Sequence, residues 1–316
     1  MSNSDKPFDI EEQIDSMKKY IVFRKRTKIR RLLNYAGYFR VSRYGKYLLS
    51  FTSVIKTKPD QQLLYDLYNL DIELRKLFYT YCKKAELQFK SHIANSISLS
   101  TGNQSWYLER IYYTETRGEK DKQKRLSNKK HFNKFKKILL AEENKIRTQT
   151  NKYPEFKEYR RGGARSSKKL PCWAAFAYFD FGTITNMYAY LRGDLRKDVL
   201  IYGYSKKRYG KEVTKQVDTW LDAIRNLRNV CSHHNKLVGK TSSVVLLDKE
   251  DTPGILPSNT DLLSRMYALK KLLNTEDSDS LKNDLKKIIK RSKFDVYTFS
   301  ILPNNWEDIY DRTNHL

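Results

Sequence analysis

The sequence predicts an all-α protein, and three observations carry this prediction. Only 12 Gly and 7 Pro occur in 316 residues, whereas Lys, Leu, Glu and Arg are abundant. That composition favours helices over strands. Apolar side chains between residues 63 and 89 recur at steps near three and four, the period of an amphipathic helix. A second stripe with this period covers residues 217–231.

The N-terminal part, residues 1–58, is predicted to be a basic helical region. Residues 8–35 have a helical pattern and carry a run of Lys and Arg at 24–31. Gly37 and then residues 42–45 interrupt the pattern, because glycine weakens a helix interior. We expect this region to wrap a larger helical domain.

That central helical domain is predicted over residues 59–240. It opens at Pro59-Asp60, since proline followed by aspartate and two glutamines is typical of a helix start. One long amphipathic helix, or two stacked helices, should extend from there to about Ser98. Basic residues dominate the stretch at about 116–137, which is predicted to form a basic helix or an excursion from the domain.

The second half of the domain should contain a loop and further helices. Residues 153–170 are predicted to form a basic loop, and Pro171 starts a buried helix, as proline often does. Residues 211–235 have the most regular pattern and should form the helix that carries the functional site. Three aromatic side chains are expected in the core: Trp173, Phe176 and Trp220.

Residues 241–316 are predicted to be a C-terminal helical region and tail. Residues 242–247 are compatible with one short strand. A helical pattern follows at residues 260–292, and residues 303–316 are expected to be irregular.

Charge is the second strong feature of the sequence. There are 62 Lys+Arg against 36 Asp+Glu, a formal net charge of +26, which predicts attraction to a polyanion. Nucleic acid is the first candidate and an anionic membrane the second; a generally basic protein without a polyanionic partner is the alternative. Interleaved Tyr and Phe favour RNA, because aromatic rings stack on unpaired bases. The candidate RNA-binding residues are Arg24, Lys25, Arg26, Arg30, Arg31, Lys122, Lys124, Arg125, Lys129, Lys130, Arg160, Arg161 and Arg165.

The cysteine pattern and the apolar segments favour a soluble, cytoplasmic protein. Cys82, Cys172 and Cys231 are widely spaced and odd in number, which argues against a disulfide framework. The first 18 residues contain no apolar signal core. The charge-free apolar stretch at 170–179 is about half the length of a membrane span.

Polar groups gather on one face of the predicted helix at 211–235. When the apolar stripe faces the core, Asn229 and His233 stack on the opposite face, four residues apart. Arg228 lies at the rim of this face, and His234 points closer to the core. The whole strip presents Arg225, Asn229, Ser232 and His233.

These groups could cleave RNA without a metal ion. The ribose 2′-OH would attack the neighbouring phosphate, and a histidine suits the proton transfers near neutral pH. Arginine can bind the phosphate and stabilise the pentacoordinate state, and asparagine can orient the histidine. Acid and base are both needed, so a symmetric dimer would supply a second set. The alternatives are a surface His-His pair without chemistry, or a metal site, although Cys231-Ser232-His233-His234 points its ligands in different directions.

The stretch Arg228-Asn229-Val230-Cys231-Ser232-His233-His234 resembles the Arg-Asn-x-Cys-Ala/Ser-His-His signature of the abortive-infection family that contains AbiD and AbiF. That family belongs to the HEPN superfamily, whose signature is an Arg followed a few residues later by a His. Similar segments occur in the family's order at residues 37–44, 68–75, 170–173, 181–185 and 303–306. The resemblance therefore spans residues 32–306.

Two segments depart from the family pattern. Asn235-Lys236-Leu237-Val238-Gly239 stands where the family often has Arg-Leu-Trp-Asn, and Asp180 precedes Phe181 where a Glu is usual. The resemblance implies a HEPN-type helical bundle with additional N- and C-terminal helical regions and a variable basic insertion at about 116–137. It further implies a toxin-like antiphage system, metal-independent RNA cleavage, a homodimer with a composite active site, and a structured non-coding RNA encoded nearby as partner.

The sequence and the resemblance together predict an endoribonuclease without cofactor or metal. His233 would be the acid or base, and Arg228 would bind the phosphate. Asn229 would orient the histidine ring or the phosphate, and His234 and Glu86 would have supporting roles. Glu86 and Lys90 form an ordinary ion pair in the simplest interpretation. In the functional interpretation, Glu86 positions Arg228, and the His92 side chain reaches the same site.

Two other classes of function remain open. A non-catalytic RNA-binding module would bind or sense a structured small RNA, with an affinity that falls steeply with salt and does not depend on His233. A DNA-binding regulator is less favoured, since no helix-turn-helix spacing is evident.

Overall fold

The structure, a computed structural model, describes residues 7–114, 122–149, 151–152, 154–159, 169–204, 209–210 and 212–316, without the side chains of 122–128 and 157–159. Within these ranges the chain is helical and forms no strand beyond two isolated bridges. The predicted all-α class is confirmed. The helices are α1 (Ile10–Met17), α2 (Arg26–Ala36), α3 (Tyr38–Leu49), α4 (Thr52–Ile55), α5 (Gln61–Thr101), η1 (Trp106–Leu108), η2 (Arg110–Tyr112), α6 (Lys122–Thr148), η3 (Pro154–Tyr159), α7 (Cys172–Tyr178), α8 (Phe181–Tyr190), α9 (Gly193–Gly203), α10 (Val213–Ser232), α11 (Leu262–Leu272), α12 (Thr275–Arg291) and α13 (Trp306–Arg312).

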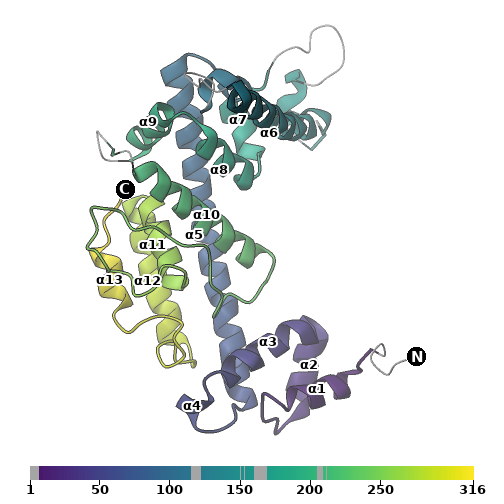
Figure 1. The fold of residues 1–316 in the computed structure, drawn as a ribbon. Coiled ribbons are helices and arrows are strands. Elements are labelled where there is room, and N and C mark those ends of the chain that lie inside the picture. The colour runs from purple at the N-terminus through teal and green to yellow at the C-terminus, as the bar shows by residue number, and fades with distance from the viewer. Residues whose placement is uncertain are drawn as a thin grey trace.

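Helix α5, 41 residues long, is the axis of the fold (Figure 1). It starts after Asp60, whose carboxylate accepts a hydrogen bond from the Leu63 amide at 2.9 Å, as an N-cap does. It ends at Gly102, which has a φ of +64°, the left-handed conformation that suits glycine at a helix C-terminus. The helix is continuous, so the alternative of two stacked helices is wrong.

The other helices are arranged along α5 (Figure 1). Helices α1 to α4 lie at its N-terminal end, while α7 and α9 pack near its C-terminal end. Helices α10, α11 and α12 pack against its middle. One contiguous apolar core reaches from Ile14 to Leu316. The C-terminal end of α10 therefore lies beside α5, on the side that faces α3.

Residues 8–35 are helical as predicted, whereas the C-terminal tail differs from the prediction. Residues 8–35 form two helices, because the backbone between them pairs with the start of α5: the Val22 amide donates to the Pro59 carbonyl at 2.8 Å. The tail at 303–316 is not wholly irregular, since it contains α13, which packs on α11. The side chains that α13 buries are spaced by three and four residues: Trp306, Ile309 and Tyr310.

Two further expectations are wrong. Residues 242–247 form no strand; two of their carbonyls instead accept side-chain hydrogen bonds from α10, Leu246 from Trp220 at 2.7 Å and Leu247 from Gln216 at 2.6 Å. Trp173 is 49% exposed. Helix α7 buries Cys172, Ala175 and Phe176 instead, and this spacing turns Trp173 outward.

The helical pattern at 260–292 is two helices in the structure. Helix α11 ends at Leu272, and Asn274 caps α12 by accepting a hydrogen bond from the Asp277 amide at 2.7 Å. None of the helices in the described parts of the chain combines the length and apolarity needed to cross a membrane.

Candidate functional site

Helix α10 carries the motif, and its apolar stripe packs as the sequence predicts. The stripe faces α5 and α11, and each of its side chains is at most 5% exposed: Val217, Trp220, Ile224, Leu227 and Cys231. Arg228 is half-buried, whereas Asn229 and His233 are exposed. The polar strip thus lies at the molecular surface, held there by the burial of the opposite face.

The helix ends earlier than predicted, within the motif itself. Its last residue is Ser232, and His233 is the C-cap. The His234 amide donates to the Cys231 carbonyl at 3.2 Å and the Asn235 amide to the Val230 carbonyl at 3.0 Å. This pattern is a Schellman motif, and its left-handed position is usually glycine. Here His234 occupies it with a φ of +54°.

Arg228 is bracketed by two partners. Its Nη1 donates to Asn229 Oδ1 at 3.2 Å, and its Nε lies 3.7 Å from Glu86 Oε2. Glu86 on α5 is 3% exposed and also pairs with Lys83 and Lys90, each at 2.9 Å. Burial by itself raises the pKa of Glu86, but the contacts with the two lysines outweigh it and keep the pKa below its ordinary range. A carboxylate therefore stands behind the Arg228 guanidinium.

His92 does not reach this area. Its ring packs edge-on against Tyr202 and Tyr204, at centroid distances of 6.1 and 5.3 Å. Burial lowers the pKa of His92 to about 4, so the ring is neutral at physiological pH. The expectation that His92 joins the site is wrong.

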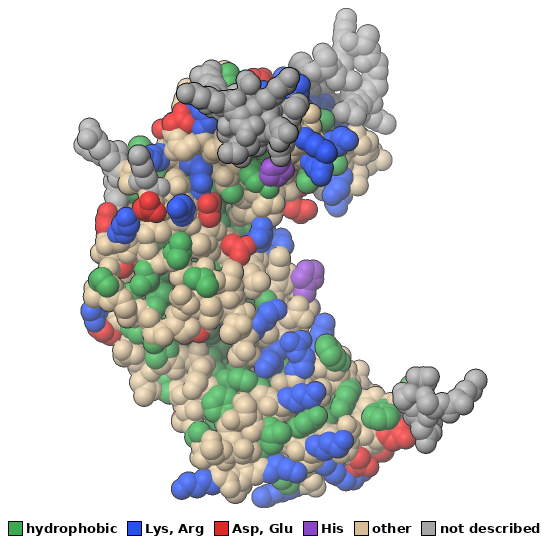
Figure 2. Space-filling view, in the orientation of Figure 1, with side chains coloured by type: hydrophobic (Ala, Val, Ile, Leu, Met, Phe, Trp, Pro, Cys, Tyr) green, Lys and Arg blue, Asp and Glu red, His purple; other side chains and the backbone are tan. Residues whose placement is uncertain are grey.

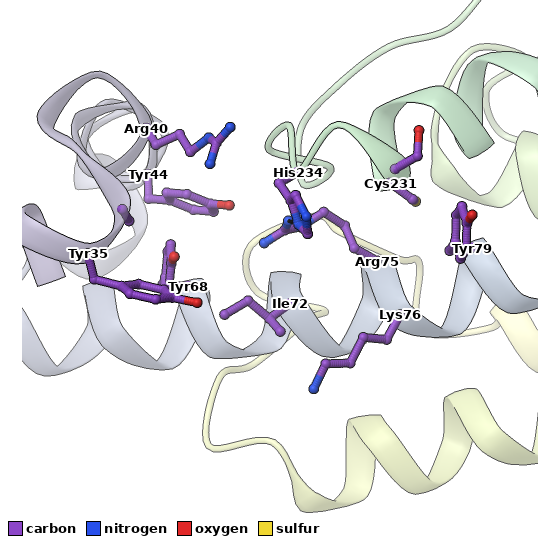
Figure 3. Close-up of a pocket in the computed structure, with 12 residues that line it drawn as sticks. Tyr35, Arg40, Tyr44, Tyr68, Ile72, Arg75, Lys76, Tyr79, Cys231 and His234 are labelled. Atoms are coloured by element: carbon purple, nitrogen blue, oxygen red, sulfur yellow. Dashed lines mark hydrogen bonds between the residues drawn. The ribbon is translucent and has the colours of Figure 1, made fainter.

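His234 is exposed, so the expectation that it points toward the core is wrong. Its ring contacts a buried network that sequence reasoning missed. Arg75 Nη1 lies 3.3 Å from His234 Nδ1 (Figure 3), and Arg75 Nε donates to Asp71 Oδ2 at 2.8 Å. Asp71, fully buried, also accepts hydrogen bonds from the Tyr44 hydroxyl at 2.7 Å and from the amides of Leu237 and Val238 at 2.9 and 2.8 Å. This network joins α3, α5 and the segment after the motif.

A signal for this network is present in the sequence. Asp71 and Arg75 are spaced by four residues among the mostly apolar buried side chains of α5, and charged residues are rarely buried unless they are paired. Both belong to the stretch 68–75 that supports the family resemblance.

A pocket of about 650 Å³ opens beside the network (Figure 3). Helices α2 and α3 form one wall, α5 the floor, and the end of α10 the other wall. The lining residues are Tyr35, Ala36, Arg40, Tyr44, Tyr68, Ile72, Arg75, Lys76, Tyr79, Cys231, Ser232 and His234.

The cysteine of the motif belongs to the core. Burial raises the pKa of Cys231 to about 12, so the thiol is protonated at neutral pH and a poor nucleophile or metal ligand. Over the ranges that the structure describes, no group of three or more His, Cys, Asp or Glu side chains is arranged to hold a metal ion.

The candidate RNA-binding residues occupy several surfaces. Arg24, Lys25 and Arg31 are exposed at α2. Arg26 and Arg30 are paired with Glu11 of α1, at 2.9 and 2.8 Å, so part of this basic run is neutralised. Two further candidates are exposed on α6, Lys129 and Lys130. The side chains of Lys122, Lys124 and Arg125, and residues Arg160, Arg161 and Arg165 as a whole, lie outside the described residues.

The surface around the motif is concave and basic on one side. Figure 2 shows a hollow between the N-terminal helices and the end of the molecule that carries α6 to α8. Lys and Arg side chains gather on the N-terminal side of this hollow, over α2 and α3. The exposed end of α10 thus lies close to a positively charged surface.

Comparison with known proteins gives one match. Residues 31–238, more than half of the chain, match the model of a family described as Abi-like protein. No curated protein and no solved structure matches the chain. The matched span begins in α2, contains the whole of α5 and α10, and ends just after the motif. The chain belongs to the family of Abi-like proteins.

Proposed function

We propose that this chain is a metal-independent endoribonuclease of the HEPN type that acts in abortive-infection defence. Membership of the Abi-like family points to abortive infection as the broad role. The observation that carries the catalytic proposal is the exposed end of α10. Arg228 contacts Asn229 and lies 3.7 Å from the buried carboxylate of Glu86, and His233 is exposed one turn after Asn229.

The proposed reaction is an internal transfer within the RNA strand. The ribose 2′-OH attacks the neighbouring phosphorus, and the bond from phosphorus to the 5′-oxygen breaks. His233 takes the 2′ proton or gives one to the leaving 5′-oxygen. Arg228 binds the phosphate and stabilises the charge of the pentacoordinate state. Asn229 orients the His233 ring or the phosphate, and Glu86 holds the Arg228 guanidinium in place. His234, which lines the neighbouring pocket, supports the catalytic residues.

A homodimer completes this mechanism. Acid and base are needed in the same reaction, and the exposed strip of one protomer offers His233 with only His234 beside it. Two α10 ends facing each other across a two-fold axis would place a second Arg228 and His233 at the same phosphate. The site is therefore proposed to be composite.

The RNA-binding module remains the second candidate, and the basic surface favours it. A net charge of +26 and the exposed residues at α2 would bind an RNA backbone without any chemistry. In either case we propose that RNA is the partner, that a structured non-coding RNA is among its ligands, and that the protein acts in the cytoplasm.

His233→Ala separates the two candidates. Purified wild type and variant are incubated with total cellular RNA in EDTA, and fragments are counted by sequencing. The endoribonuclease should lose at least about a hundredfold of its cleavage rate, the usual contribution of an acid–base group, while its RNA affinity is unchanged. His131→Ala, which removes an exposed histidine on α6, is the matched control and should cut like wild type. Equal cleavage by wild type and His233→Ala would overturn the catalytic assignment.

A further inference from the structure

We propose that the pocket between α2, α3, α5 and the end of α10 binds one unpaired nucleotide of an RNA strand, and so directs cleavage to single-stranded RNA. This inference rests on the proposed function of the neighbouring motif and names the substrate class of that site. The volume of the pocket, about 650 Å³, lies within the range of sites for small organic ligands, roughly 300–1,000 Å³.

Aromatic rings supply the walls that a base would need. Tyr35, on α2, is 85% exposed, and Tyr79, on α5, is 39% exposed. Tyr68 packs edge-on against Tyr44 at a centroid distance of 5.3 Å, and the Tyr44 hydroxyl is bound to Asp71. Tyr44 and Tyr68 are therefore fixed, while Tyr35 lines the same pocket and is largely exposed to solvent (Figure 3). An exposed tyrosine beside a fixed aromatic floor is suited to stacking on a base.

The charge of the lining favours a nucleotide over an uncharged ligand. Arg40, Arg75 and Lys76 line the pocket, and no carboxylate does among the described residues. Arg75 is bound to Asp71 and Lys76 to Glu73, so Arg40, exposed at the rim of α3, is the cation best placed to bind a phosphate.

The pocket is contiguous with the proposed catalytic motif. Ser232 and His234 form its wall on the α10 side, and Arg75 of the pocket contacts His234. The strand that continues from a nucleotide bound here would therefore pass Ser232 and His234, the motif residues next to His233. Bases in a duplex are stacked and paired, so their faces are unavailable to these rings, whereas a splayed base can enter.

The test measures binding, not cleavage, so that it does not depend on the motif being catalytic. His233→Ala protein is titrated in EDTA with a single-stranded RNA of about ten nucleotides, a length that spans a typical single-strand site. The same sequence as a duplex and adenosine 5′-monophosphate are titrated in parallel. Tyr35→Leu and Tyr35→Phe are added in the His233→Ala background. Tyr202→Leu removes an exposed tyrosine of α9 that does not line the pocket, and is the control.

The proposal expects the single strand to bind at least tenfold more tightly than the duplex. Tyr35→Leu should weaken single-strand binding about tenfold, the effect of losing one stacked base, while Tyr35→Phe and Tyr202→Leu bind like the parent. Equal affinity for strand and duplex, or no effect of Tyr35→Leu, overturns it. Mononucleotide binding as tight as that of the strand also overturns it, since the site would then serve a free nucleotide.

Failure of the pocket and failure of the nuclease give different results. If wild type cuts RNA but Tyr35→Leu changes neither binding nor the preference for unpaired sites, the endoribonuclease stands and the pocket assignment falls. If the strand preference and the Tyr35 effect are found but wild type cuts no RNA, the pocket stands and the catalytic proposal falls.

Discussion

At the scale of single residues, Glu86 links the stability of the fold to the motif. It is buried, it faces Arg228, and two lysines keep its pKa low. A carboxylate whose pKa is lowered by folding stabilises the protein above its unfolded pKa of about 4.3, and this contribution is lost as pH falls through the lower folded pKa. The acid sensitivity of the protein should therefore depend in part on this one side chain.

Glu86→Gln tests this dependence. At neutral pH the free energy of unfolding should fall by about 2 kcal/mol, the usual worth of a hydrogen bond to a buried charge. The difference between variant and wild type should shrink below pH of about 4.3. Urea unfolding at several pH values measures it. Glu73→Gln, which removes an exposed carboxylate paired with Lys76, should change stability by less than about 1 kcal/mol; a constant Glu86→Gln deficit at every pH would contradict the account.

The sequence predicted some residues of the candidate site and missed others. The resemblance singled out Glu86, Arg228 and His233, and the structure brings Glu86 to Arg228 across two helices. Asp71 and Arg75 were missed as site residues because their importance depends on tertiary contacts. Their partners are the Tyr44 hydroxyl and the backbone after the motif, which no local pattern reveals.

At the scale of the element, the end of α10 is the unusual feature. A non-glycine residue in the left-handed conformation costs about 1 kcal/mol or more, and His234 adopts it inside the motif. Helix α5 ends at Gly102 with a similar φ, so the same fold also uses the unstrained solution. Strain at a functional site is held in place by the surrounding structure, here the contact with Arg75.

Two substitutions at His234 should reveal this strain. Both remove the imidazole, but His234→Gly should be more stable than His234→Ala by about 1 kcal/mol, since only glycine tolerates φ near +54° without cost. At the helical position Asn229 the order should reverse, with alanine favoured by about 1 kcal/mol. Thermal or urea unfolding of the four variants decides it. Alanine at least as stable as glycine at position 234 would show that the left-handed C-terminus of α10 is not formed.

Helices with a long apolar period were predictable, and helix ends set by distant contacts were not. The stripe of α10 and the start of α5 at Asp60 agree with the sequence prediction. The break between α1 and α2 has neither glycine nor proline, and it follows from the pairing of Val22 with the start of α5. The end of α10 at Ser232 could not be foreseen either, because His234 takes the place of the usual glycine.

At the scale of the whole molecule, shape and charge agree with the proposed substrate. The end of α10 lies at a hollow in the molecular surface, and basic side chains gather on the side of this hollow that α2 and α3 form (Figure 2). Composition alone predicted a polyanionic partner from the net charge of +26, yet it could not predict that α1 neutralises part of the basic run at α2. The division into regions at residues 58 and 240 stays a prediction.

The most direct test of the central claim is the chemistry of the fragment ends that the protein produces in EDTA. Attack by the ribose 2′-OH with proton transfer by His233 predicts 2′,3′-cyclic phosphate and 5′-hydroxyl ends from wild type, and none of these ends from His233→Ala. Fragments with 3′-hydroxyl and 5′-phosphate ends, or cleavage only after a divalent metal ion is added, would contradict the account, because water activated by a metal would then be the nucleophile.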